Sequence, residues 1–597
     1  MQPHRYPFGV IGNCSCMAYI DLQGDVGWLC MPRFDGDPVF ASMLDSENGG
    51  CFSVVSHGSR PLKQAYLDNT NILCTDVQVD GGAIRITDFA PRFVEFGRSF
   101  RPNMLFRRLE VLEGQPMIAL RCHPLSAQGA PPCRPVQGSN HISWEGAARP
   151  MRLTTDLPLS HLMSGERFLL TGTRYLVFTY GPGLEAPLRE TAEVFLQKTL
   201  DYWRQWVKST SIPHLFQRQV IRSALVLKLH QFEDTGAIIA SGTTSLPEAP
   251  GAARNWDYRY CWLRDSYYTL RAFADIGQFQ ELENYFHFAQ DIAARHPEGI
   301  LPLYTIEGKA VPDETVSDFS GYLGNGPVRF GNGANRQQQF DIYGQLLVST
   351  LPLYRDRRIA KSDRSFNRSL IRQLLTLMDR DFDVPDAGIW EYRNRQQRHT
   401  YTYLFHWAGA CAATRMAAEL NDGVLRSVAE ELSLRARSRI EEAFVPSEGR
   451  WGQAIGQPAP DASTLQLITL GYLDSRDPRA LSHLRSLEKA LSAPNGLFYR
   501  YRHDDDFGAP ETTFLVTGFW RAEALACLGL LDEAEDCIRR LLACGNHLGL
   551  LSEDVSSDGS QWGNFPQTYS HVGLMNAVSR LARKLDRPFF MEGEDDV

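Results

Sequence analysis

An antiparallel β-sandwich followed by a ring of six helical hairpins, an (α/α)6 barrel, is the fold class that the sequence predicts. The chain has 597 residues, more than one small core needs, so two or more domains are expected. Before about residue 200, short β-branched and aromatic segments alternate with turn residues, and beyond it the apolar period changes to 3.6. This change of period separates a β domain from a helical domain.

The N-terminal segments have the length and composition of antiparallel strands. Turn signals such as Gly81-Gly82 and Ala130-Pro131-Pro132 interrupt them, a pattern that favours a sandwich over βαβ units. The predicted strands are Phe52–Val55, Asn71–Val79, Ala83–Phe89, Leu105–Leu112, Met117–Cys122 and Arg174–Tyr180. We assign residues 1–185 to the β-sandwich domain and residues 186–212 to a helical linker.

About twelve helices are predicted in residues 213–590, which we assign to the barrel. The first two carry apolar stripes from Val220 to Leu229 and from Leu270 to Ile276, and Gly277 stands where a helix-ending glycine is expected. The others are residues 281–294, 336–353, 365–381, 402–420, 424–443, 462–472, 478–492, 513–528, 531–544 and 568–584. Twelve helices without intervening strands suggest a closed ring, with a helical array as the alternative. No fixed repeat is visible, which disfavours a solenoid.

Composition and charge exclude several classes of partner. A net charge of −9 gives no polybasic footprint, which argues against nucleic acid. No apolar run approaches the roughly 20 residues of a membrane span, and no signal peptide is visible, so we expect a cytoplasmic protein. The twelve cysteines are scattered, and Cys14-x-Cys16 alone is weak evidence for zinc. We expect no metal and no organic cofactor; a homo-oligomer stays open.

Two glutamates, Glu391 and Glu553, are the candidate catalytic groups. Each lies among aromatic, small and polar residues, and splitting a glycosidic bond usually takes two carboxyl groups. In a helical toroid, the long loops at one end build the active site. Here these loops are residues 241–264, 301–335, 383–401, 494–512 and 546–567, and both glutamates fall in them.

Other clusters in the loops have a functional and a structural interpretation. The segment Arg254–Asp265 holds four aromatic residues, three arginines and two aspartates, which suit a sugar pocket or an Arg–Asp pair at a helix start. The loop Gly324–Gly333 matches no phosphate-binding motif and is better explained as a pocket rim with Arg329 near the substrate. His571 is expected to cap or pack, and the rival acids Asp313 and Glu314 to be solvated.

Several motifs in the same order resemble those of a known family. They are Gly12-Asn13, Gly27–Asp35, Gly49-Gly50, Thr244–Glu248, Asn255–Asp265, Pro327–Asn332, Gly388–Glu391, Asp461–Ser463, Phe519-Trp520, Gly563–Gln567 and Ser570-His571. Together they resemble glycoside hydrolase family 15, the group of glucoamylases, glucodextranases and bacterial trehalases, and most closely its trehalase-like branch. The chain departs from the family pattern at Asn13, at residues 392–398, and at Thr512, where the family usually has glycine.

The resemblance implies a role for each matching residue. Glu391 takes the position of the general acid and Glu553 that of the general base. Arg264 and Asp265 match the pair that binds the terminal glucose hydroxyls, and Arg500 matches a substrate-binding arginine. The remaining matches are Trp262 and Trp390 as pocket walls and Tyr258 beside the attacking water.

The implied activity is that of an inverting, exo-acting α-glucoside hydrolase that releases β-glucose, with a small-molecule carbohydrate as its partner. Inversion needs room for water between the carboxyl groups, roughly 6.5–9.5 Å. Trehalose or another small α-glucoside is the favoured substrate, and α-1,4- or α-1,6-gluco-oligosaccharides are the alternative. A transglycosylase or lyase on the same barrel stays open, as does a non-catalytic carbohydrate-binding or regulatory protein.

Overall fold

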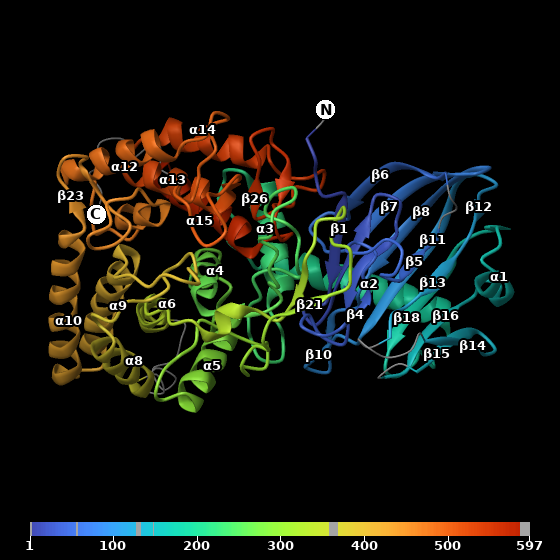
Figure 1. Cartoon of the computed structure of the whole chain (residues 1–597). Helices are drawn as coiled ribbons and strands as arrows, with labels where there is room; N and C mark the ends of the chain where they lie inside the picture. The colour runs from blue at the N-terminus through green and yellow to red at the C-terminus, as the bar shows by residue number, and fades with distance from the viewer. Residues whose placement is uncertain (1–2, 55–57, 127–132, 147–148, 358–367, 586–597) are drawn as a thin grey trace, which may run out of the picture.

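A β-sandwich and a closed barrel of helices lie side by side in the computed structural model, which describes residues 3–54, 58–126, 133–146, 149–357 and 368–585. The sandwich is at the right of Figure 1 and the barrel at the left. The predicted fold class is confirmed. The end of the predicted strand at Val55, the start of the predicted helix at 365–367 and barrel residues 586–590 lie outside the described residues. The domain boundaries at residues 185 and 212 stay predictions.

Two antiparallel sheets form the sandwich. The first has the order β1-β2-β3-β5-β13, with β4 also paired to β3, and the second has the order β14-β15-β16-β18-β11-β8-β7-β6. The first sheet comprises β1 (Phe8–Gly12), β2 (Met17–Asp21), β3 (Val26–Cys30), β4 (Pro38–Phe40), β5 (Cys51–Ser53) and β13 (Arg121–His123). The second comprises β6 (Arg60–Tyr66), β7 (Leu73–Val79), β8 (Gly82–Phe89), β11 (Met104–Gly114), β14 (Arg134–Gln137), β15 (His141–Glu145), β16 (Met151–Thr155) and β18 (Arg174–Tyr180).

Alternation along the strands explains the sandwich core. In β7, Leu73, Thr75, Val77 and Val79 are buried, while the residues between them are more exposed. Because side chains alternate across a strand, this places one apolar face against the opposite sheet. The predicted strand at 117–122 is split into β12 (Met117–Ile118) and β13. Strands β1 to β4, β6 and β14 to β16 were missed.

A long helix connects the two domains. Helix α2 (Leu188–Lys208) packs against β18 and against β9 (Phe93–Glu95), which pairs with β10 (Arg98–Phe100). Its Trp206 Nε1 donates a hydrogen bond to Glu281 Oε1 at 3.0 Å, in the barrel. The helix therefore contacts both domains rather than spanning a gap between them.

The barrel is two concentric rings of helices that alternate along the chain. Each inner helix contacts the next, and the last closes on the first. The inner helices are α4 (Leu263–Asp275), α6 (Asp341–Arg355), α9 (Thr400–Glu419), α11 (Gln466–Thr469), α13 (Leu515–Cys527) and α15 (Thr568–Leu585). The outer helices are α3 (Gln217–His230), α5 (Phe279–Arg295), α8 (Arg368–Arg380), α10 (Gly423–Glu442), α12 (Pro478–Leu491) and α14 (Leu531–Leu542).

Two glycines let α6 and α9 pack closely in the inner ring. A Cβ on Gly344 would lie 1.9 Å from the carbonyl oxygen of Phe405, and one on Gly409 would lie 2.5 Å from Cα of Gly344. Side chains at these positions would push the backbones apart, so the glycines set the interhelical distance.

The predicted absence of strands in the barrel is wrong in detail. Short strands pair within the loops at its mouth, including β21 (Thr315–Ser317) with β22 (Val328–Phe330) and β19 (Cys261–Trp262) with β20 (Leu303–Tyr304). Strands of two or three residues are too short to show a period of two in a sequence. They stiffen the loops that form the candidate site.

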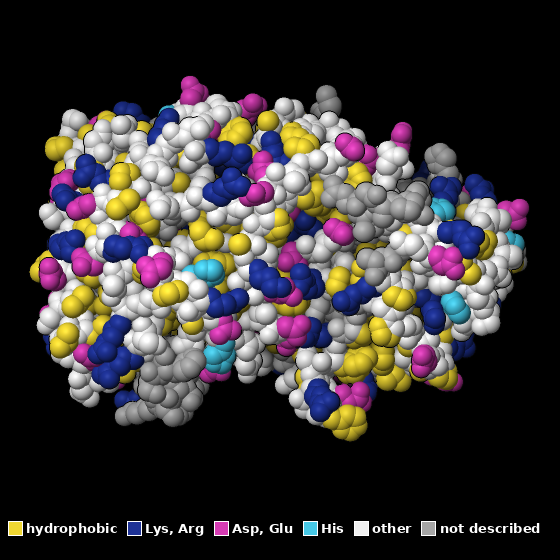
Figure 2. Space-filling model, turned by 60° about the horizontal axis from the view of Figure 1, so that its bottom comes forward, with side chains coloured by type: hydrophobic (Ala, Val, Ile, Leu, Met, Phe, Trp, Pro, Cys, Tyr) yellow, Lys and Arg dark blue, Asp and Glu magenta, His cyan; other side chains and the backbone are white. Residues whose placement is uncertain are grey.

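The distribution of charged side chains on the surface and the polarity of the helices match what the composition predicts. On the face shown in Figure 2, Lys and Arg side chains are interspersed with Asp and Glu side chains. Among the described helices, none is both long enough and apolar enough to pass through a membrane.

Candidate active site

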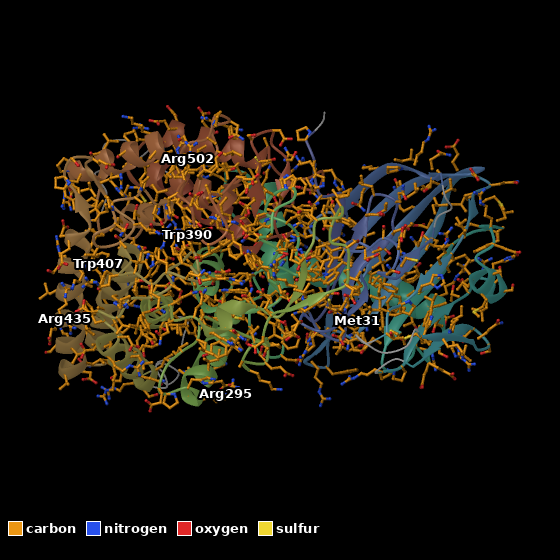
Figure 3. All side chains as sticks on the ribbon, viewed as in Figure 1. Met31, Arg295, Trp390, Trp407, Arg435 and Arg502 are labelled. Carbon is orange, nitrogen blue, oxygen red and sulfur yellow. The ribbon has the colours of Figure 1, made fainter. Side chains whose placement is uncertain are left out.

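A cavity opens where the inner helices begin. Each of the five loops predicted to build the active site contributes lining residues, among them Glu248, Asn332, Glu391, Asp505 and Glu553. Trp390, labelled in Figure 3, lies over the interior of the ring. Of the nine residues selected from the sequence, eight line this cavity: Tyr258, Trp262, Arg264, Asp265, Trp390, Glu391, Arg500 and Glu553.

The loop that carries Glu391 has a strained backbone. Glu391 has a φ of 58°, in the left-handed region that residues other than glycine rarely adopt. Two hydrogen bonds hold this conformation: Gln337 Nε2 donates to the Glu391 carbonyl oxygen at 3.0 Å, and the Glu391 N–H donates to the carbonyl oxygen of Gly388 at 3.1 Å. Such strain at a cavity wall is typical of functional residues.

Three donors converge on one oxygen of the Glu391 carboxyl group. Oε1 accepts from Trp262 Nε1 at 2.7 Å, from Gln339 Nε2 at 3.2 Å and from Arg264 Nη2 at 3.3 Å. Among the described residues, none donates to Oε2. The fixed Oε1 sets the orientation of the group, and Oε2 is the oxygen that can carry an acidic proton toward a ligand.

Glu553 directly precedes β26 (Asp554–Val555). This strand belongs to a small sheet with β25 (Thr513–Phe514) and β27 (Gln561–Trp562). Oε1 of Glu553 accepts from the Tyr258 hydroxyl at 2.7 Å, and its Oε2 accepts from the N–H of Asn564 at 3.2 Å. The N-terminal segment secures this loop, since the Tyr6 hydroxyl donates to the carbonyl oxygen of Gly563 at 2.9 Å. The β-sandwich domain therefore helps to position the Glu553 carboxyl group.

Two adjacent aromatic rings connect the glutamates. Tyr258, which donates to Glu553, and Trp262, which donates to Glu391, pack edge to face with centroids 5.4 Å apart. Each carboxyl group thus has its own aromatic donor on the segment that leads into α4. This arrangement fixes the two acids relative to each other through one rigid segment.

Burial makes Glu553 hard to ionise. Together with the nearby Glu248 carboxylate, burial raises the pKa of Glu553 to about 8, although the Tyr258 hydrogen bond and Arg500 act in the opposite direction. The role of general base leads to the opposite expectation, that Glu553 is ionised near neutral pH. The structure differs because Glu248, which comes from a different loop, adds to the effect of burial.

The raised pKa predicts the pH dependence of catalysis. The family resemblance implies that Glu553 is a general base, which works only when ionised. This role predicts that kcat/KM falls about tenfold for each pH unit below the pKa of Glu553 and levels off near pH 8. A pH profile of kcat/KM, which reports the free enzyme, measures this limb. A limb near pH 4.5, the ordinary glutamate range, would contradict the expected burial effect.

Arg264 and Asp265 open α4, and both residues line the cavity. Arg264 Nε and Asp265 Oδ1 are 3.4 Å apart, and neither makes a hydrogen bond within the part of the chain that the structure describes. Burial raises the pKa of Asp265 to about 7, partly offset by Arg264. A charged Arg–Asp pair at the wall of a cavity is suited to bind the hydroxyl groups of a ligand.

Five charged residues that line the cavity were not selected from the sequence: Glu248, Arg254, Arg393, Asp505 and Asp506. Glu248 accepts from Arg500 Nη2 at 2.8 Å, and Arg254 makes a bidentate ion pair with Asp505 at 2.9 and 2.6 Å. Glu248 and Arg254 are in motifs named above, but only the folded loops show which partners they meet. Asp505 carried no signal beyond its place in an acidic run.

Arg329 is the one selected residue that does not line the cavity. Its Nη1 donates to the carbonyl oxygens of Ala253 and Asn255 at 2.8 and 2.9 Å, and its Nε pairs with Glu314 at 3.0 Å. Through these contacts the guanidinium group stabilises the loop that contains Ala253 and Asn255 and precedes α4. A substrate-binding role for Arg329 has no support from this geometry.

The structure also places the residues that the sequence analysis set aside. His571 is fully buried, with Nδ1 2.8 Å from Ser223 Oγ and Nε2 accepting from the N–H of Leu551 at 3.1 Å, so it packs as predicted. The Asp313 side chain is 63% exposed, as expected, whereas Glu314 is largely covered and pairs with Arg329 and Arg393.

The fold and this cavity place the chain among the glycoside hydrolases. Residues 216–537 match the family described as glycosyl hydrolases family 15, and residues 6–156 match a trehalase-like N-terminal domain. The chain belongs to glycosyl hydrolases family 15, as the resemblance of its motifs implied.

Relatives match along nearly the whole chain. Trehalases of Thermoplasma acidophilum and Thermoplasma volcanium are 31% and 30% identical to it; the alignments cover 96% and 97% of this chain and 98% and 93% of theirs. The trehalase of Mycobacterium tuberculosis is 30% identical, with 98% and 91% covered. A bacterial glucoamylase solved in complex with acarbose has a TM-score of 0.71 at 14% identity, over 98% of this chain and 95% of that one. That similarity supports the two-domain fold.

Proposed function

We propose that the protein hydrolyses the α-glucosidic bond of trehalose with inversion, using Glu391 as general acid and Glu553 as general base. The observation that carries this proposal is the placement of the two carboxyl groups. Both line one cavity, each is held by a separate aromatic donor, and no hydrogen bond joins them among the described residues. Inverting hydrolysis needs such a pair, with room for water beside the base.

The proton transfers balance in one displacement. Glu391 gives its proton to the glycosidic oxygen as the bond to the anomeric carbon breaks. Water attacks that carbon from the opposite face, and Glu553 takes the proton that the water loses. Exchange with solvent then returns a proton to Glu391 and removes one from Glu553. Tyr258, which donates to Glu553, orients the base for the water.

The remaining residues of the cavity are suited to a glucose unit. Arg264 and Asp265 line the cavity as a charged pair, and such side chains can bind hydroxyl groups. Trp262 and Trp390 supply apolar ring surface, and Trp390 is fixed by a hydrogen bond from its Nε1 to Asp461 Oδ2 at 2.8 Å. Trehalose is favoured over longer glucans because trehalases are similar to this chain along its whole length. The cytoplasmic location, the homo-oligomer and the absence of a cofactor stay predictions.

A substrate panel tests the assignment to trehalose. We expect glucose release from trehalose to exceed that from maltose, isomaltose, kojibiose, nigerose, dextran and starch, measured as kcat/KM for each. Faster release from maltose or isomaltose would instead favour a glucoamylase or glucodextranase activity. Product analysis in the presence of an added sugar tests for transglycosylation. Glucosyl transfer to that sugar would indicate a transglycosylase.

A further inference from the structure

Three carboxyl groups, including that of the candidate base, meet in a buried corner of the site. One oxygen from each of Glu248, Glu553 and Asp554 lies within 4.8 Å of an oxygen of the other two. The three residues are 5%, 1% and 1% exposed. Like charges this close and this dry cannot all be ionised, so at least one group must hold a proton.

The hydrogen-bond donors in the corner are unevenly distributed. Glu248 accepts from Arg500 Nη2 at 2.8 Å and from Trp256 Nε1 at 3.1 Å. Glu553 accepts from Tyr258 and from the N–H of Asn564, one donor to each oxygen. Donors stabilise the ionised form of a carboxyl group, so these two residues are prepared to carry negative charge.

Asp554 has fewer donors than either glutamate. Its Oδ1 accepts from Thr512 Oγ1 at 3.1 Å, whereas its Oδ2 is buried and has no hydrogen-bond partner in the described parts of the chain.

A glycine covers the corner closely. Gly563 has a φ of 73°, and a Cβ there would lie 2.7 Å from Glu553 Oε2 and 3.1 Å from Asp554 Oδ2. The two oxygens therefore lie beneath one stretch of backbone. An ionised Asp554 would place an unsatisfied charge next to the base in a space that water cannot easily reach.

The surrounding charges do not compensate for three carboxylates. The titratable and charged groups that face Asp554 are Glu248, Glu553 and Arg500, with the phenol of Tyr6 from the N-terminal segment. Arg254 is 4.0 Å from Glu248, but its guanidinium group is already bound to Asp505. Among the described residues, Arg500 is the one arginine that hydrogen-bonds a carboxyl group of the corner. Burial raises the pKa of Asp554 well above its usual range.

We propose that Asp554 stays protonated over the working pH range and serves as a positioning residue for the base. Its neutral carboxyl group accepts a hydrogen bond from Thr512. The negative charges of the corner are then on Glu248 and Glu553. The inference rests on the proposed function only in naming Glu553 as the base. The protonation of Asp554 is a property of the free protein and is tested separately from activity.

Infrared spectroscopy tests the proton directly. About one pH unit above the pKa of Glu553, which is about 8, the wild-type protein should show a protonated carboxyl band that is missing in Asp554→Asn and present in Glu248→Gln. Absence of the band from the wild type, or its survival in Asp554→Asn, would overturn the proposal. A band that appears only after Mg²⁺ or Ca²⁺ is chelated would also overturn it, because a cation would then occupy the corner.

Kinetics provide a matched second test. Asp554→Asn removes no charge under the proposal, so the acidic limb of kcat/KM should not move. Glu248→Gln removes a charge at about 5 Å and should move the limb down by roughly two pH units. A downward shift in Asp554→Asn would mean that Asp554 is ionised and would overturn the proposal. A hydrolysis assay of Glu553→Gln separates these outcomes from failure of the proposed function, because full activity there removes Glu553 as the base whatever Asp554 does.

A variant without polar atoms tests the positioning role. Asp554→Leu leaves Thr512 Oγ1 without its partner and makes the corner more apolar, so the limb should move up and kcat/KM should fall further than in Asp554→Asn. Equal kinetic effects of the two substitutions would contradict a positioning role. If Asp554→Leu does not fold, the comparison of Asp554→Asn with Glu248→Gln still decides.

Discussion

Glutamine at position 391 or 553 should lower kcat about 10²–10⁴-fold while substrate still binds, because each substitution removes one half of the proton transfer and retains the shape of the side chain. Glu391→Gln leaves no acidic proton for the glycosidic oxygen. Glu553→Gln leaves the attacking water without a base. Single-turnover hydrolysis together with ligand binding by calorimetry would separate the loss of chemistry from any loss of affinity.

Controls make this result specific. Asp313→Asn removes an exposed carboxylate that is 63% accessible and paired with Arg336, and it should leave kcat unchanged. The melting temperature of Glu553→Gln should not fall, because the substitution removes a buried group that burial and the Glu248 carboxyl group make costly to ionise. Near wild-type turnover in either glutamine variant would mean that the role assigned to that glutamate is wrong.

Loss of the Arg264–Asp265 pair should have the second largest effect. Asp265→Asn and Arg264→Ala should each lower kcat/KM roughly 10²-fold, since a hydrogen bond to a charged group in a buried site contributes about 1.5–3 kcal/mol. The reduction should appear in kcat as well as in KM, because contacts to sugar hydroxyls tighten in the transition state. Steady-state kinetics with the preferred substrate would measure both constants.

Arg329→Ala is the matched control for the pair. This arginine belongs to the same set of motif residues, but its guanidinium group binds backbone carbonyls and Glu314 outside the cavity. Arg329→Ala should lower the melting temperature and leave kcat/KM close to that of the wild type. If Arg329→Ala reduced kcat/KM as much as Arg264→Ala does, the cavity would not be the place where the glucose unit is recognised.

Much of the fold could be predicted from periodicity. The change near residue 200 identified the two domains, and the helices from 281–294 to 568–584 were found because apolar stripes of this length are distinctive. The short strands at the mouth of the barrel were missed, since pairs such as Cys261–Trp262 with Leu303–Tyr304 depend on loops that meet only after folding. The small α11 was predicted as a longer helix, residues 462–472, but its first turn is a 3₁₀ helix over Ala462–Leu465.

The candidate site was predictable as a set of residues and less so as an electrostatic environment. Local motifs identified eight residues of the cavity, because sugar-binding loops concentrate aromatic and charged residues in short segments. The raised pKa of Glu553 depends on Glu248, which the sequence places in another loop. The left-handed backbone of Glu391 depends on Gln337 in the same way. Arg329 resembled a pocket residue because its motif is near the pocket, and only its contacts show where the guanidinium group is used.

The stereochemistry of the first product is the most direct test of the account. Proton NMR spectra recorded in the first minutes of hydrolysis, before mutarotation, distinguish the two anomers of glucose. We expect the β-anomer signal to rise first, because Glu391 and Glu553 come from separate loops and, in the proposed mechanism, act on opposite faces of the sugar with water between. The α-anomer appearing first would mean retention through a covalent intermediate, and it would contradict the roles proposed for both glutamates.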